Sequence, residues 1–486
     1  MIRAPGSTAG SGLLGPALAT LAAVVVFGLV FGLSALGGDS SSQLGLIVVG
    51  LPAVAASGFL AARRPVWSVA AAVFLTAFAG TLATNQGIPP KFLDASIWLL
   101  LLGLVAAMIA GYLNVSRPRQ VAIWPGAAAL AAYLIFTAFS IPFAETADIG
   151  TKAFIAGPAF IVAFFGLAYL QWGPDVRWRI AQAFVLVALM VGAYALYRLL
   201  GGPTAAELAV TRKSGGVAGE LTLIGSFGSR QQLSGWCAVA IPFVFAFVVA
   251  ARGRWRWVGT GALALLIVAL LGSEVRTALV AAAVGLALGA VLFQAARAFK
   301  SERLTALMAI AALAVPGMVG FTLTVGSDPE SAERFARIVS PGEDKSFQSR
   351  LLKWDAALAE INEHPFGQGL GTTGTTQRLY SRTYRLDNRY IDNSYLQLGV
   401  QQGYPGWILL GASVLMIGYM LLRSTLAAVD WRLAAIGIGA AASLAAWLVT
   451  LWTGEMLTAW AALLLWMLLG LAVGGFVRPT PGRANR

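Results

Sequence analysis

Three arginines lie in short segments rich in glycine or serine, and two of these segments adjoin long apolar runs. Arg230 lies in GSFGSRQQLSG, Arg276 in GSEVRT and Arg350 in SFQSRLLKW. A guanidinium group stays charged and presents a planar fork of N–H donors that matches phosphate oxygens. Neighbouring glycines let the backbone approach a ligand closely. Together the three segments predict a cationic pocket that could hold a lipid diphosphate.

A simpler interpretation stays open for each arginine taken alone. Arginines at helix ends also anchor in lipid headgroups or pair with nearby acids, and Glu274 beside Arg276 could be such a partner. Glu274 is at the same time a candidate catalytic carboxylate. Gln231, which follows Arg230, is a candidate polar ligand of the substrate.

A fourth segment, IDNSYLQLGVQQGYPG, opens a long apolar run. Asp392 and Asn393 are residue types that cap helices, and both are also candidate catalytic groups. Tyr395 follows them as a candidate substrate-binding side chain. Gly403 and Gly406 around Pro405 predict a break in the helix a turn or two further on, which favours packing against a cavity.

The elements that must position these residues are membrane-spanning helices. The chain has 486 residues, 58% of them hydrophobic and 11% charged, with a mean hydropathy of +0.76. Soluble domains are nearer half apolar and a quarter charged. The single cysteine, Cys237, excludes an intrachain disulfide, and neither cysteine pairs nor histidine clusters for a metal are present. The composition predicts an all-α, polytopic integral membrane protein.

Apolar runs of about 20 residues recur along most of the chain, as spanning helices require. We expect about 12–14 transmembrane helices, near 13–37, 44–62, 67–84, 95–114, 123–144, 153–172, 179–200, 232–251, 257–272, 277–297, 304–325, 394–422, 433–452 and 457–477. Alternate loops then carry 18 basic and three acidic residues on one side, against 16 basic and 18 acidic on the other. Because basic loops stay in the cytoplasm, both termini are predicted to be cytoplasmic.

Two outer loops are long, over about 201–231 and 326–393. The second is long enough to form a small subdomain, with a helix predicted within LLKWDAALAEI and a glycine-rich turn in FGQGLGTTG. The predicted regions are N-terminal helices over 1–200, helices carrying the outer arginines over 201–325, a large outer loop over 326–393 and C-terminal helices over 394–486.

In this order, the four segments resemble the O-antigen ligase and polymerase superfamily of bacterial envelope glycosyltransferases. The family has a glycine-rich turn with arginine, then Ser-x-x-Arg between two helices. An outer loop with Arg…Trp and Pro-x-x-Gly-x-Gly follows, and then a His-Asn-x-Tyr-like stretch before a glycine-containing helix. The matching positions here are Gly228–Gln231, Ser273–Arg276, Arg350–Trp354 with Pro365–Gly371, and Asp392–Leu396 with Gln402–Gly406. The resemblance covers roughly residues 220–410.

The resemblance implies an enzyme that polymerises or transfers a polyprenyl-diphosphate-linked glycan at the outer face of the bacterial inner membrane, with no cofactor and no metal. By position, Arg230 and Arg276 would stabilise the diphosphate leaving group, Arg350 would also contact phosphate, and Gly369 and Gly371 would line the sugar cleft. The implied partners are the lipid-linked oligosaccharide, a glycan acceptor, membrane lipid, a flippase and a chain-length regulator, without nucleic acid.

One position departs from the family pattern. Ligases place a histidine where this chain has Asp392–Asn393, and the only histidine, His364, lies elsewhere and is interpreted as structural. The departure favours a polymerase-like relative. A base still assists attack by a sugar hydroxyl, and the candidates are Asp392 first, Glu274 second and Asp387 third.

Two other classes of function fit a many-span chain. A flippase or transporter of lipid-linked glycans would carry charges at mid-membrane, whereas this chain places nearly all its charges at helix ends and in loops. A non-catalytic scaffold of an envelope assembly is disfavoured only by where the arginines lie.

Overall fold

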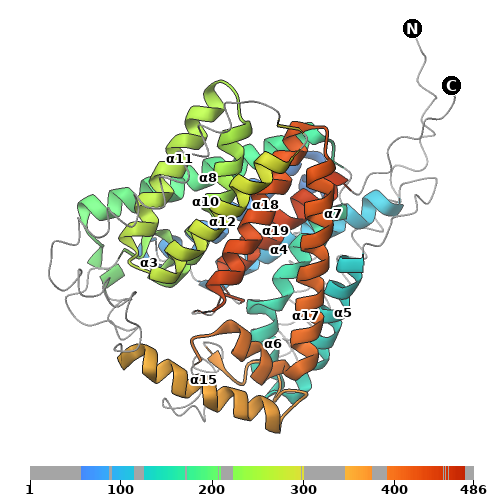
Figure 1. Ribbon diagram of the computed structural model, residues 1–486, viewed down its shortest axis with the longest axis vertical. Helices are drawn as coiled ribbons and strands as arrows, with labels where there is room; N and C mark the ends of the chain where they lie inside the picture. Colours follow the sequence, from blue (N-terminus) through green and yellow to red (C-terminus); the bar gives the residue numbers. More distant parts are fainter. Residues whose placement is uncertain are drawn as a thin grey trace.

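The computed structural model describes residues 56–86, 90–113, 125–169, 172–205, 207–208, 223–296, 298–299, 345–374, 391–452, 454, 456–457 and 459–476. Its regular elements within these ranges are helices, which confirms the all-α class (Figure 1). The predicted helices over 13–37 and 304–325, and most of 44–62, lie outside the described residues, as does about half of each of the two long predicted outer loops.

The described residues contain nine helical segments long and apolar enough to cross a membrane. They are α3 (Pro65–Asn85), α5 (Pro125–Phe139) with η1 (Ile141–Phe143), α6 (Ala147–Ala156) continued by η2 (Pro158–Ile161) and α7 (Val162–Tyr169), α8 (Pro174–Gly201), α10 (Arg230–Ala250), α11 (Arg254–Gly272), α12 (Arg276–Ala295), α17 (Ser394–Ala427) and α18 (Trp431–Thr450). Two further helices, α4 (Pro90–Leu113) and α19 (Trp460–Phe476), have shorter apolar stretches. A polytopic membrane protein is confirmed, and the total of 12–14 helices stays a prediction.

Helix α10 forms the centre of the bundle, with its apolar window buried throughout. It packs against α18, α11, α12 and α19 (Figure 1). Small residues allow this close approach, as is usual between membrane helices. A Cβ on Gly285 of α12 would lie 2.5 Å from Cγ of Pro242, and one on Gly439 of α18 would lie 2.8 Å from the ring of Phe243.

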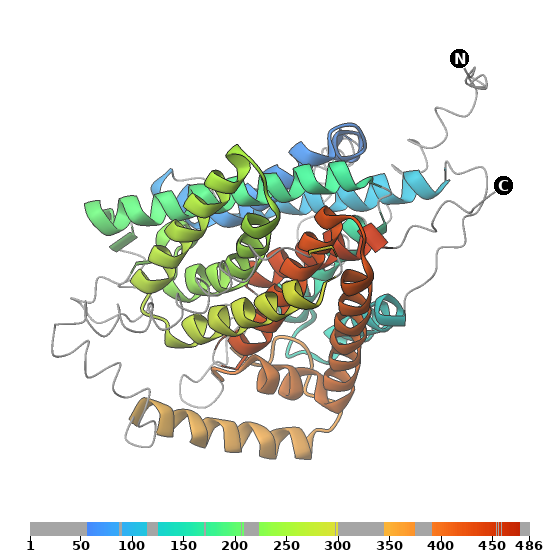
Figure 2. The same cartoon turned by 45° about the horizontal axis from the view of Figure 1, so that its top comes forward.

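Helices α3, α4 and α8 lie along one side of this centre, seen as the blue to green ribbons at the top of Figure 2. Helix α3 packs against both α4 and α8, and α8 packs against α11. Gly192 makes the α8–α11 contact possible, because a Cβ there would lie 2.6 Å from Cβ of Leu265. This layer supports the helix ends that carry Arg230 and Arg276.

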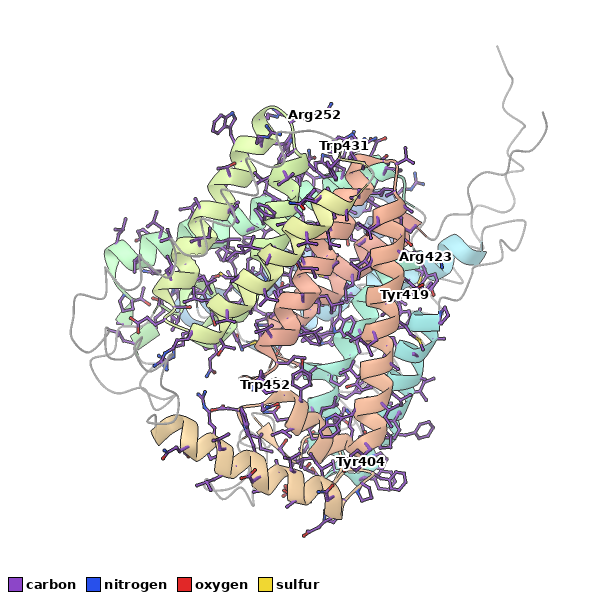
Figure 3. All side chains as sticks on the ribbon, viewed as in Figure 1. Arg252, Tyr404, Tyr419, Arg423, Trp431 and Trp452 are labelled. Carbon is purple, nitrogen blue, oxygen red and sulfur yellow. The ribbon has the colours of Figure 1, made fainter. Side chains whose placement is uncertain are left out.

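The two ends of the bundle differ in their side chains. At one end Arg432 forms an ion pair with Asp175, and Arg252 stacks over the ring of Trp431 with 5.5 Å to its centroid. Trp452 and Tyr404 lie toward the other end, near α15 (Figure 3). A basic cluster at one end is the asymmetry expected of a membrane protein with a cytoplasmic face.

Helix α15 (Lys345–Glu363) lies across the end of the bundle that faces away from Arg252 (Figures 1 and 2). It contains the helix predicted within LLKWDAALAEI and extends it in both directions. Ala357 and Ile361 are buried against Ile391, Leu396 and Val400, while Leu352 is 73% exposed. The apolar face with its helical spacing therefore fixes α15 on the start of α17.

Candidate active site

Arg230 and Arg276 are the first residues of α10 and α12, which pack side by side and run parallel (Figure 1). Both arginines therefore lie at the same end of the bundle. Ser229 caps α10, its Oγ accepting from the amide of Gln232 at 3.2 Å. Val275 precedes α12 and provides no side-chain cap. Two positive helix ends, each with a guanidinium group, make this edge suited to an anion.

The turns that lead into these two helices touch each other. The amide of Leu223 donates to the carbonyl of Gly272 at 3.4 Å. The first turn also rests on α3, because a Cβ on Gly80 would lie 2.3 Å from the backbone of Phe227. Arg230 and Gln231 are exposed, and Arg276 is half-buried. The structure thus places the two arginine segments of the sequence at the same end of two neighbouring helices.

Glu274 lies in the turn before α12 and is exposed. Its φ of +56° is left-handed, the single described non-glycine residue with positive φ. Such a conformation is uncommon for a residue with a Cβ and marks a tightly constrained turn. The constraint directs the chain sharply from α11 into α12, so that Arg276 follows Glu274 at the edge of the bundle.

Arg350 of α15 and Asp392 form an ion pair, with 3.4 Å between Nε and Oδ2. The two side chains are 35% and 23% exposed, so the pair remains open to solvent and to a ligand. The first candidate base and the third candidate phosphate ligand are therefore direct neighbours. The sequence predicted Arg350 and Asp392 as separate site residues and did not indicate that they form an ion pair.

The residues after Asp392 hold the start of α17 in place. Oδ1 of Asn393 accepts from the amides of Tyr395 and Leu396 at 2.9 and 3.2 Å, which is the predicted helix cap. Asn393 is buried. The Tyr395 hydroxyl donates to the carbonyl of Leu448 at 2.7 Å, so its ring rather than its hydroxyl is left to face a ligand.

Helix α17 is kinked where the sequence predicted a break. Gly403 has φ +63° and ψ −162° inside the helix. Pro405 lacks an amide hydrogen, so the carbonyl of Gln401 has no donor from its own helix. The amide of Tyr404 turns away to donate to Pro365 at 2.9 Å, which leaves the carbonyl of Val400 free as well.

Two amides of the glycine-rich turn donate hydrogen bonds to these two carbonyls. The amide of Gln368 donates to Val400 at 2.9 Å, and that of Gly369 donates to Gln401 at 3.0 Å. Gly369 and Gly371 both have positive φ. A Cβ on Gly369 would lie 2.3 Å from the backbone of Phe143. Both glycines are buried against protein atoms, so they position the segment instead of meeting solvent.

A small cavity of about 40 Å³ lies behind this segment. Amide side chains of α17 line it together with apolar residues, among them Gln397, Gln401, Gln402, Thr373 and Tyr133. A volume of this size holds a few water molecules and not a sugar ring. The cavity therefore supports the kinked backbone rather than a glycan.

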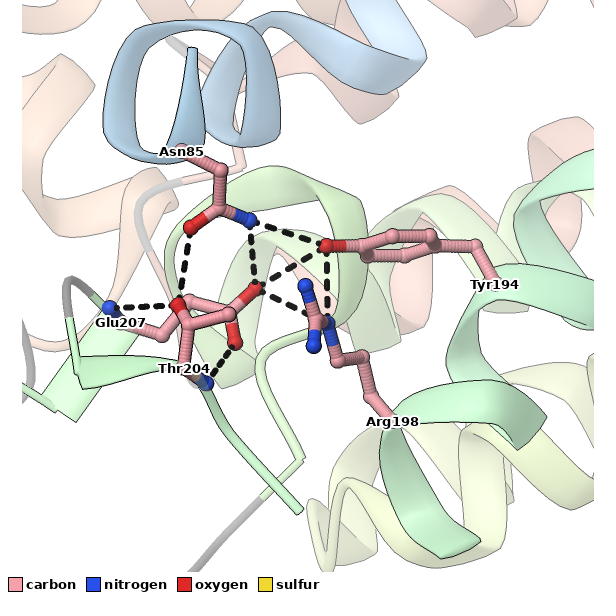
Figure 4. Close-up of polar contacts among 5 residues, drawn as sticks. All are labelled: Asn85, Tyr194, Arg198, Thr204 and Glu207. Atoms are coloured by element: carbon pink, nitrogen blue, oxygen red, sulfur yellow. Dashed lines mark hydrogen bonds and ion pairs between the residues drawn. The ribbon is translucent and has the colours of Figure 1, made fainter. Parts of the chain in front are cut away.

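A polar cluster that the sequence interpretation missed lies at the C-terminal ends of α3 and α8 (Figure 4). Glu207 is buried, and its Oε1 lies 3.3 Å from Nε of Arg198. The same oxygen accepts from the Asn85 amide at 3.2 Å and from the Tyr194 hydroxyl at 3.1 Å. One carboxylate thus joins two helices to the segment that follows α8.

The second oxygen of Glu207 belongs to a local motif. Oε2 accepts from the amide of Thr204 at 2.8 Å, and the Thr204 hydroxyl accepts from the amide of Glu207 at 3.1 Å. This is a capping box, and its T-x-x-E pattern could have been found in the sequence. The Thr204 hydroxyl also donates to Asn85 at 2.8 Å. The cluster thereby holds the segment that follows α8 against α3. Gly80 of the same helix α3 supports the turn before Arg230.

Among the residues that the structure describes, no three histidine, cysteine, aspartate or glutamate side chains gather as a metal site would require. No curated protein matches the chain. Residues 261–411 match a family model described as O-antigen ligase. The matched region contains Arg276, Arg350 and Asp392, whereas Arg230 precedes it.

The match supports a glycosyl-transferring enzyme of envelope polysaccharide biosynthesis, and the apolar helices support a multi-pass protein of the bacterial inner membrane. Over these residues the resemblance to the O-antigen ligase and polymerase superfamily, first indicated by the ordered motifs, is confirmed.

Proposed function

We propose that the chain transfers a glycan from a polyprenyl-diphosphate donor to a glycan acceptor at the outer face of the membrane, and that it is polymerase-like. The observation that carries the proposal is the position of Arg230 and Arg276 as first residues of two adjacent parallel helices. In the reaction the acceptor hydroxyl attacks the anomeric carbon, and the bond from that carbon to the diphosphate oxygen breaks. The negative charge that develops on the diphosphate needs fixed positive groups.

Arg230 and Arg276 supply those groups in this proposal. Their guanidinium forks bind the diphosphate oxygens, and the amides at the two helix ends add to the same field. Gln231 donates a further hydrogen bond from the first turn of α10. Glu274 holds the turn that presents Arg276, and it is the second candidate for a base.

Asp392 accepts the proton of the acceptor hydroxyl. Its partner Arg350 lies 3.4 Å away and orients this carboxylate, and a donor phosphate can compete for the same guanidinium group. Asn393 fixes the position of Asp392 by capping α17. The turn with Gly369 and Gly371 supports the kinked α17 from within the protein, and the ring of Tyr395 contributes to substrate binding.

The proposal also covers the setting of the enzyme. Both termini are cytoplasmic, 12–14 helices span the membrane, and residues 326–393 form one large outer loop between the helices over 201–325 and those over 394–486. No metal or cofactor takes part. A flippase delivers the lipid-linked oligosaccharide, and a chain-length regulator acts with the polymerase.

The test is the size of the surface polysaccharide in a deletion strain of the source bacterium. Complementation compares the wild type with Arg230→Ala, Arg276→Ala and Asp392→Asn. Arg254→Ala is the matched control, because Arg254 is an exposed first residue of a helix at the opposite end of the bundle. We expect single repeat units in the deletion strain and in the three site variants, and a full ladder with wild type and Arg254→Ala.

Two results would contradict the proposal. Accumulation of long polymer on the carrier lipid after deletion would make the protein a ligase. A polysaccharide profile that deletion leaves unchanged would exclude glycan transfer as the function and favour transport. Membrane levels of each variant are measured by immunoblot so that loss of protein is separated from loss of activity.

A further inference from the structure

An exposed tryptophan outside the sequence motifs lies at the turn between α18 and α19, within an aromatic cluster. Trp452 is 57% exposed. Its ring meets those of Trp354 and Tyr395 edge to face, with 6.3 Å between centroids in each case. Three separate elements therefore contribute to one cluster: α15, the start of α17 and the α18–α19 turn.

The cluster lies one helical turn from the Arg350–Asp392 ion pair. Trp354 follows Arg350 by four residues on α15, so the two side chains share a face of that helix. Tyr395 follows Asp392 by three residues at the start of α17. The ion pair and the aromatic cluster are thus successive contacts between the same two elements.

The rings are held in place by their surroundings. The Tyr395 hydroxyl donates to Leu448 at 2.7 Å, and the indole N–H of Trp407 donates to the Tyr395 carbonyl at 2.6 Å. The turn of Trp452 is itself fixed, because the amide of Ser394 donates to Leu451 at 2.9 Å. The exposed face of Trp452 is therefore presented in a defined orientation.

The position of Trp452 argues against a lipid anchor. Anchoring tryptophans stand on the outer perimeter of a membrane protein, at headgroup level. Trp452 instead packs against α15 on one side and α17 on the other, and Figure 3 places it between the central helices and α15. Trp452 therefore offers an exposed aromatic surface that its ring contacts hold next to α15 and α17.

We propose that Trp452, supported by Trp354 and Tyr395, is the binding platform for a pyranose ring of the donor glycan. The face of an indole ring carries negative charge density, and a sugar presents a face of weakly positive C–H groups. Arg350, the third proposed phosphate ligand, lies one helical turn from Trp354 on α15, so a sugar joined to that phosphate would lie beside this surface. The inference rests on the proposed function and adds the subsite that recognises the sugar.

The test measures binding by the full-length protein in lipid nanodiscs, with two probes. One probe is the lipid-linked oligosaccharide extracted from the source bacterium, and the other is undecaprenyl diphosphate without sugar. For Trp452→Ala we expect affinity for the glycosylated probe to fall about three- to tenfold, the loss of one aromatic contact, with binding of the sugar-free probe unchanged. Trp452→Phe keeps most of the affinity, because a ring face remains.

Trp257→Ala is the control, since Trp257 is 78% exposed near the start of α11, at the opposite end of the bundle. Equal loss of both probes in Trp452→Ala would show a lipid anchor and overturn the proposal, as would unchanged binding of the glycosylated probe. If the wild type binds neither probe, the proposed function itself fails. If instead the wild type binds both probes and Trp452→Ala binds them equally well, only the sugar subsite fails and the proposed function stands.

Discussion

Arg350 and Asp392 form an ion pair that joins α15 to the start of α17, with Nε and Oδ2 3.4 Å apart. The pair connects the residue proposed to contact phosphate with the residue proposed to take the acceptor proton. Because both side chains are partly exposed, we expect the pair to contribute at most about 1 kcal/mol to stability. We therefore expect its main effect to be on the proposed transfer reaction and not on folding.

The first prediction concerns this pair. Asp392→Asn should lower kcat about 10²- to 10⁴-fold, the usual contribution of a general base, while the thermal unfolding midpoint changes little. Arg350→Ala should mainly raise the KM of the lipid-linked donor. Turnover of a defined donor by purified protein measures both. A kcat of Asp392→Asn equal to wild type would exclude Asp392 as the base.

The second prediction separates the shape of the cation from its charge. Arg276→Lys keeps the positive charge but loses the planar fork, so we expect a donor affinity between those of wild type and Arg276→Ala. Arg230→Lys should behave in the same way. Binding of undecaprenyl diphosphate in nanodiscs measures the series. Equal affinity in lysine and arginine forms would mean that the site needs charge alone.

The third prediction concerns the kink of α17. A Cβ on Gly403 would lie 2.1 Å from the carbonyl oxygen of Pro365, and its φ of +63° disfavours any side chain. Gly403→Ala should therefore destabilise the protein by at least about 1–3 kcal/mol, the scale of backbone strain. Gly411 of the same helix has open space around its Cβ position.

Gly411→Ala is the matched control for the kink. It should be neutral or stabilising by up to about 1 kcal/mol, because alanine favours a helix over glycine. The thermal unfolding midpoints of both variants in detergent are compared with wild type. Similar midpoints for the two alanine variants would show that the loop does not depend on the backbone at Gly403.

The fourth prediction concerns the cluster around Glu207. Its carboxylate is 3% exposed and Arg198 is 15% exposed, so Glu207→Gln leaves a largely buried arginine without its counter-charge. A loss of about 3–5 kcal/mol in stability is expected. Adding Arg198→Met should restore part of the loss, since the unpaired charge is then gone. Midpoints of the single and double variants form the test, and additive losses would contradict a buried pair.

Local patterns in the sequence predicted the local geometry well. The apolar runs predicted the helices, GSEVRT predicted the sharp connection before α12, and the glycines around Pro405 predicted the kink. Each of these depends on neighbours along the chain: the 3.6-residue period of a helix, the missing amide of proline, and the freedom of glycine at positive φ.

Contacts between distant segments could not be predicted in the same way. Arg350 and Asp392 appeared as two separate candidates because nothing local requires a partner for either one. The capping box of Thr204 and Glu207 could have been found in the sequence, but its contacts with Asn85 and Arg198 depend on how α3 and α8 pack. Trp452 lies in an apolar run where aromatic residues are common, so its exposure emerged only from the fold.

The kink of α17 has a consequence for which substitutions the chain can tolerate. The loop is fastened to the helix through main-chain atoms, since amides of Gln368 and Gly369 meet carbonyls of Val400 and Gln401. Apart from the glycines and the proline that the geometry requires, main-chain bonds of this kind do not depend on side-chain identity. Residues along α15 can therefore be exchanged while the loop keeps its register on α17.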